Sequence, residues 1–155
     1  MPARAIFYPR LPDDLMTAPA HRRCQGVYNH DEAYFAEILD AARLGGSIAW
    51  MRRWAKRKSI PGAEEGKRLE AVIKKIIQGL HYRHTGRLLS PETLIRITPV
   101  LWEERANQYQ EPNLNFHVRG NYGEFKYAFT PGANGLTTWI LVFHERFMFR
   151  CEVIT

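Results

Sequence analysis

The chain has 155 residues, of which 45% are hydrophobic and 25% are charged, and its formal net charge is +6. These values fit one globular domain that buries roughly two-thirds of the surface exposed by its unfolded chain. No run of roughly 18 or more apolar residues occurs, so the sequence predicts no membrane span, and the two cysteines are too few and too distant to indicate a disulfide framework.

The first 30 residues are predicted to be irregular, because they are rich in proline and lack a long apolar core. The N-terminus also lacks the apolar segment of a secretory signal. Together with the cysteine usage, these features lead us to expect a reduced, cytoplasmic protein.

Helical periodicity predicts three helices between residues 31 and 89. The first begins near Asn29 or His30 and ends at Gly45-Gly46, and the second follows a capping Ser47. The third has the clearest apolar stripe. Gly86 is expected to end it, because glycine readily adopts the left-handed backbone conformation that typically terminates a helix. The residues of that stripe are Leu69, Val72, Ile73, Ile76, Ile77 and Leu80.

After Ser90-Pro91 the apolar period changes to two, which predicts short strands. The expected strands cover residues 94–97, 114–118, 125–129, 139–143 and 147–151. Helices followed by strands predict an α+β fold, with a helical N-terminal half packed on a C-terminal antiparallel sheet of four or five strands. We therefore expect one domain, 1–155, made of an irregular segment (1–30), basic helices (31–89) and the sheet (90–155).

The positive charge is concentrated between residues 52 and 87, a segment that contains eleven Lys or Arg and three Glu and so has a local net charge of +8. Concentrated charge can attract a polyanion, although charge alone favours the simpler interpretation of a solvated helix face. The basic residues at the end of the second helix are Arg52, Arg53, Lys56, Arg57 and Lys58.

Three stretches in order resemble a group of bacterial HNH endonucleases. The first combines PARAIF (2–7), DLMTAPA (14–20), HRRC (21–24) and DEAYF (31–35). The second is IIQGLHYRHTGR (76–87), and the third is the aromatic sheet from Gly123 to Phe149. The resemblance spans most of the chain, and it implies a nuclease ancestry.

The chain departs from that family at the residues that carry the chemistry. HNH enzymes need a histidine base and metal ligands together. The family's Asp-His pair and its first Cys pair would fall before Met1. The second Cys pair is represented by His21 and Cys24, with Gln25 in place of Asn, and two ligands do not close a four-ligand zinc site. The expectation is a vestigial knuckle, no cofactor and no catalysis by residues 1–155. The less favoured alternative is a zinc ion held by His21 and Cys24 with two donors from elsewhere, of which His30 is the nearest candidate.

A second cluster lies at the end of the third helix, where His81, Arg83, His84 and Arg87 fall close together. Histidines near a helix C-terminus interact favourably with the last carbonyls, which requires no function. The alternative is a group of side chains that contacts phosphate. The aromatic residues of the strands likewise fit a half-buried sheet face better than a platform for stacking bases.

The sequence thus leads to three hypotheses. The first is a catalytically inactive HNH-derived module that binds nucleic acid or a nucleoprotein complex through its basic helices. The second is a protein-interaction factor of phage or mobile-element type that inhibits or scaffolds a partner enzyme through the aromatic sheet. The third is a fragment of an active HNH endonuclease whose start lies further upstream.

Overall fold

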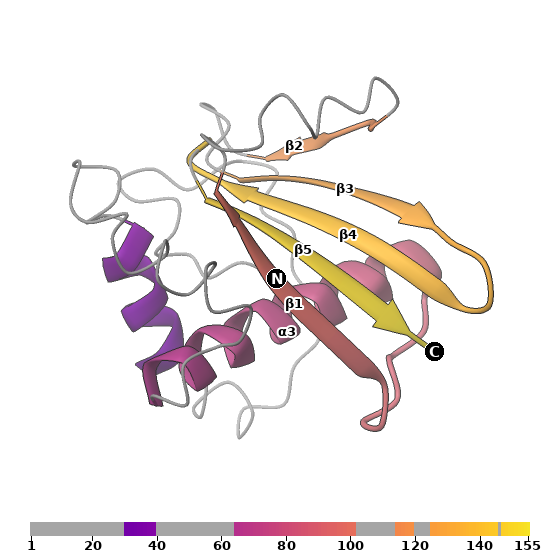
Figure 1. The fold of residues 1–155 in the computed structure, drawn as a ribbon, viewed down its shortest axis with the longest axis horizontal. Helices are drawn as coiled ribbons and strands as arrows, with labels where there is room; N and C mark the ends of the chain where they lie inside the picture. Colours follow the sequence, from indigo (N-terminus) through magenta and orange to yellow (C-terminus); the bar gives the residue numbers. More distant parts are fainter. Residues whose placement is uncertain (1–29, 40–63, 102–113, 120–124, 146) are drawn as a thin grey trace.

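The computed structural model describes residues 30–39, 64–101, 114–119, 125–145 and 147–155 (Figure 1). Residues 30–39 are helical, and the long helix α3 covers Glu64–Thr85. The predicted second helix and the segment 1–29 lie outside the described residues. The strands are β1 (Leu94–Leu101), β2 (His117–Arg119), β3 (Phe125–Pro131), β4 (Leu136–Phe143) and β5 (Phe147–Ile154).

The five strands form one sheet in the order β1-β5-β4-β3-β2, and every neighbouring pair is antiparallel. Strands β2 to β5 follow one another as a meander, whereas β1 lies at the far edge beside β5. Pro99 is accommodated in β1 because an edge strand has one side free of ladder hydrogen bonds. The α+β fold with a C-terminal antiparallel sheet is confirmed.

Two tight hairpins set the register of the central strands. Asn134 and Gly135 have φ of 55° and 75° in the β3–β4 turn, as expected for an Asn-Gly pair. A Cβ at Gly135 would also lie 2.6 Å from the carbonyl oxygen of Thr155, so glycine is required there. In the β4–β5 turn, His144 and Glu145 adopt φ of 49° and 54°, and the two strands that flank them pair as an antiparallel hairpin.

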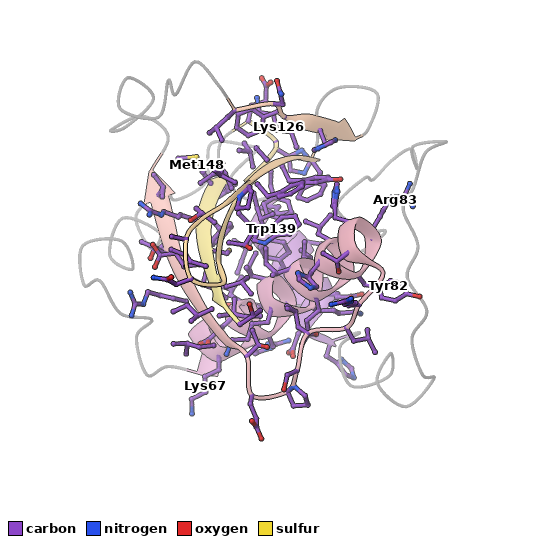
Figure 2. All side chains as sticks on the ribbon, turned by 90° about the vertical axis from the view of Figure 1, so that its right-hand side faces the viewer. Lys67, Tyr82, Arg83, Lys126, Trp139 and Met148 are labelled. Atoms are coloured by element: carbon purple, nitrogen blue, oxygen red, sulfur yellow. The ribbon has the colours of Figure 1, made fainter. Side chains whose placement is uncertain are left out.

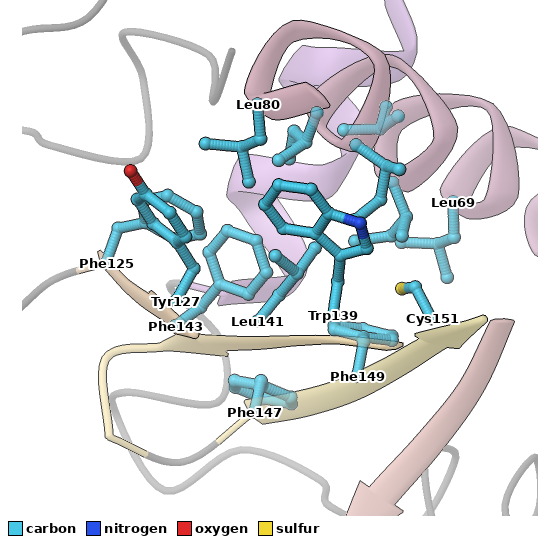
Figure 3. Close-up of a cluster of buried hydrophobic side chains, with 14 of the residues drawn as sticks. Leu69, Leu80, Phe125, Tyr127, Trp139, Leu141, Phe143, Phe147, Phe149 and Cys151 are labelled. Atoms are coloured by element: carbon cyan, nitrogen blue, oxygen red, sulfur yellow. The ribbon is translucent and has the colours of Figure 1, made fainter. Parts of the chain in front are cut away.

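The inner face of the sheet is aromatic and is covered by helices. Figure 1 shows α3 running along this face, with residues 30–39 beside its first half. Phe35 contributes by packing edge-on to Phe143, with ring centroids 5.1 Å apart. Figure 3 shows Trp139 between β4 and α3, in a core where the whole predicted stripe of α3 is at most 2% exposed. Burial of each Leu, Ile or Val side chain of this stripe stabilises the fold by about 1.5–3 kcal/mol.

A smaller apolar cluster lies on the opposite face of the sheet. It consists of Val100, Ile140, Val142 and Met148, against which Leu114 and Phe116 pack. Strand β4 is therefore buried on both faces from Trp139 to Phe143. That burial explains why its sequence is continuously apolar rather than alternating. In the part of the chain that the structure describes, no helix has the length and apolarity needed to cross a bilayer.

The central position of α3 generates a stability prediction. Ile76 is fully buried, so Ile76→Ala should lower the free energy of unfolding by about 2–5 kcal/mol through lost burial and the cavity left behind. Urea unfolding followed by circular dichroism measures the change. Gln78→Ala, at an exposed position of the same helix, is the control and should change stability by less than about 0.5 kcal/mol. Equal effects of the two substitutions would contradict the assigned packing face.

Candidate functional site

Four of the candidate residues predicted from sequence are described, and all four lie at the C-terminal end of α3. His81, Arg83 and His84 belong to its last turns, and Arg87 follows immediately. Figure 2 shows Arg83 and the neighbouring Tyr82 projecting away from the body of the molecule. The other candidates lie outside the described residues; these are His21, Cys24, Arg52, Arg53, Lys56, Arg57 and Lys58.

The end of α3 is defined by local hydrogen bonds. Gly86 adopts φ of 70° and donates its backbone N–H to the carbonyl oxygen of Tyr82 at 2.7 Å, as in a left-handed helix cap. The Thr85 hydroxyl donates to the carbonyl oxygen of His81 at 2.8 Å. The helix therefore stops abruptly, and Arg87 is carried on the exposed segment that follows.

Much of the positive charge along α3 is neutralised within the fold. Arg68 donates from Nε to Asp31 at 2.8 Å and from Nη2 to the carbonyl oxygen of His30. Lys75 forms an ion pair with Glu32, and Lys74 forms one with Glu70 at 2.6 Å. These side chains hold residues 30–39 against α3 or brace the helix itself. They are consequently not free to attract an external polyanion.

The arginines at the end of α3 are in a different situation. Arg83 and Arg87 are both exposed, and neither forms a side-chain ion pair with any other described residue. Lys67, near the opposite end of the helix, is also exposed (Figure 2). The exposed arginine charge on α3 is thus concentrated at one end.

His84 connects this end of the helix to the sheet. Its Nε2 lies 3.0 Å from the Tyr127 hydroxyl, and its ring centroid is 4.6 Å from that of Phe129. His117 on the edge strand β2 joins the group, since its ring stacks on Tyr127 at 4.9 Å and lies 5.3 Å from that of His84. Sequence reasoning missed His117 as a member of this group. The only sequence signal was its place in a predicted strand, which gives no indication of the pairing with Tyr127.

The aromatic strands form the core rather than a binding platform. Six aromatic side chains of strands β3 to β5 are at most 3% exposed beneath the helices: Phe125, Tyr127, Trp139, Phe143, Phe147 and Phe149. Phe129, on the same face, is half-buried next to His84 and His117. A partner protein therefore has no access to most of the aromatic sheet as a docking surface.

Among the described residues, no three His, Cys, Asp or Glu side chains are grouped so as to hold a metal ion. His117 and Tyr127 stack with an interplanar angle of 20°. Burial lowers the pKa of His81, because desolvation favours the neutral imidazole over the charged form.

Comparison of the chain with protein-family models, with curated proteins and with solved structures finds no match.

The lowered pKa of His81 predicts a pH-dependent contribution to stability. The folded chain resists protonation of this imidazole, while the unfolded chain takes up a proton near pH 6.5. Acidification from pH 7.5 to 5.5 should therefore destabilise the wild-type protein more than a His81→Gln variant. Urea unfolding at several pH values measures the difference, and equal m values show that the same transition is compared. A pH-independent difference between the two proteins would contradict the prediction.

Proposed function

We propose that this chain is a nucleic-acid-binding module related to HNH endonucleases, which binds through the C-terminal end of α3 and does not itself cleave. The observation that supports the proposal most strongly is the distribution of charge along α3. Arg68, Lys74 and Lys75 are paired with carboxylates within the fold, whereas Arg83 and Arg87 remain exposed and unpaired among the described residues. The resemblance of residues 76–87 to a nuclease helix end supports the same assignment.

Arginine suits phosphate because its planar guanidinium donates two parallel hydrogen bonds. The helix itself works against phosphate at this end, since its C-terminus carries a partial negative charge. That field falls off within the last turn, and the long arginine side chains can reach beyond it. Phosphate contacts of this kind position a protein on nucleic acid without reading its sequence. Binding with little sequence preference is the expected result.

Absence of cleavage is proposed for residues 1–155 because they contain no match to the family's Asp-His pair. A histidine base typically contributes about 10²–10⁴-fold in rate, and the metal ligands of the family are likewise not represented. A longer protein that supplied these residues upstream would restore the enzyme hypothesis. The basic residues 52–58 add to the charge of the chain, but the proposal does not depend on where they lie.

The charge at the end of α3 predicts a specific salt dependence. Each phosphate contact contributes about 0.9 to the slope of log K against log salt concentration for duplex DNA, and about 0.7 for single-stranded DNA. The double variant Arg83→Ala/Arg87→Ala should therefore bind both more weakly, with a slope shallower by up to about 1.8 for the duplex and up to about 1.4 for the single strand. Fluorescence anisotropy of a labelled oligonucleotide across a salt series measures the slope.

A matched control distinguishes the effect of where a charge lies on α3 from the effect of the total charge of the protein. Lys67→Ala removes one charge from the opposite end of α3, and Arg83→Ala removes one from the proposed site. Only Arg83→Ala should change the slope. Identical slopes for both single variants and the wild-type protein would exclude the end of α3 as the binding site.

A second prediction concerns catalysis. Purified protein of residues 1–155, incubated overnight with supercoiled plasmid and excess magnesium or manganese, should leave the plasmid intact on a gel. Nicking that co-elutes with the protein over several columns would contradict a non-catalytic module. A preparation with Arg83→Ala and Arg87→Ala is the control, because weakened binding should also reduce any genuine nicking.

A further inference from the structure

We propose that the end of α3 and the adjoining β2–β3 edge bind unpaired nucleotides, with a base stacked on the His84, His117 and Phe129 rings and its phosphates held by Arg83 and Arg87. This inference rests on the proposed function and names its ligand class, which is single-stranded nucleic acid.

The three rings come from different elements and share one location. His84 is exposed on the last turn of α3, while His117 on β2 and Phe129 on β3 are half-buried. The Phe129 ring centroid lies 4.6 Å from that of His84 and 6.3 Å from that of His117. The other large aromatic side chains of the inner face are at most 3% exposed. Among the described aromatic side chains on the inner face of the sheet, the partly open rings therefore lie at this edge.

The His84, His117 and Phe129 rings are held in place by buried aromatic side chains of the core. Trp139 stacks on Phe129 with centroids 4.7 Å apart and an interplanar angle of 25°. Tyr127, itself 1% exposed, stacks on His117 and hydrogen-bonds to His84. Rings fixed by a packed core lose little conformational entropy when a base stacks on them. This preorganisation distinguishes them from aromatic side chains that project singly into solvent.

The surroundings of the rings favour a polyanion. The segments that form the group are 81–87, 117–119 and 125–131, and they contain no Asp or Glu. Arg83 immediately precedes His84 in the chain, and Arg87 follows three residues later. Aromatic rings beside cations are the combination by which proteins bind single strands, since every base has a face on which to stack.

The requirement for an unpaired base follows from stacking geometry. In a duplex the base faces are covered by neighbouring base pairs, so an aromatic ring at the protein surface reaches only phosphates and groove edges. Unpaired bases can turn outward and stack on protein rings. Duplex binding by this site should thus depend on the arginines alone, and single-strand binding on arginines and rings together.

The experiment compares a labelled single-stranded DNA, the RNA of the same sequence and the corresponding DNA duplex, with the full chain, by fluorescence anisotropy at two salt concentrations. Wild type should bind the single strands more tightly than the duplex. Phe129→Leu should weaken single-strand binding by about 5- to 150-fold, the loss expected for one stacked base, and leave duplex binding unchanged. His117→Gln, which removes a ring but keeps a polar side chain, should act in the same direction and serves if Phe129→Leu does not fold.

Phe147→Leu is the matched control, because it makes the same chemical change in the buried core on β5 and should alter neither affinity. Equal affinity for single strand and duplex, unaffected by the Phe129 and His117 substitutions, would overturn this inference while leaving the proposed function intact. Binding to none of the three nucleic acids would overturn both.

Discussion

The aromatic inner face of the sheet must be covered, and this requirement organises the rest of the molecule. Phe125, Tyr127, Trp139, Phe143 and Phe149 present a large apolar surface that cannot remain in water. The 22-residue helix α3 is long enough to cover it, and its stripe from Leu69 to Leu80 supplies the complementary surface. Because that stripe must face the sheet, the remaining faces of α3, and the direction in which its C-terminus emerges, are determined as well.

The same packing decides which of the described basic residues are paired within the fold. Residues 30–39 complete the cover over Phe143 and bring Asp31 and Glu32 to the side of α3, where they meet Arg68 and Lys75. Partly buried pairs of this kind orient one helix against the other, although their net contribution to stability is small. Beyond Leu80 no described carboxylate forms an ion pair with the helix, so Arg83 and Arg87 remain unpaired among the described residues.

Tyr127 links the core to the candidate site. Its ring is buried in the sheet face, its hydroxyl meets His84, and His117 stacks upon it. The positions of both histidines therefore depend on the register between β2 and β3, which pairs His117 with Tyr127. The proposed binding site is therefore held by the fold, and its geometry depends on the β2 edge as well as on the arginines.

The sequence by itself determined the fold class, the stripe of α3, the glycine that ends it and the approximate strands, because helical and strand periodicities are local patterns that survive without tertiary context. It also indicated Arg83, His84 and Arg87 through their closeness in the chain. Only the tertiary structure decided that Arg68 and Lys75 are neutralised, since Asp31 and Glu32 lie about forty positions away. The same holds for His117, which reaches His84 only because a strand register, set by long-range packing, places an edge strand beside the end of a helix.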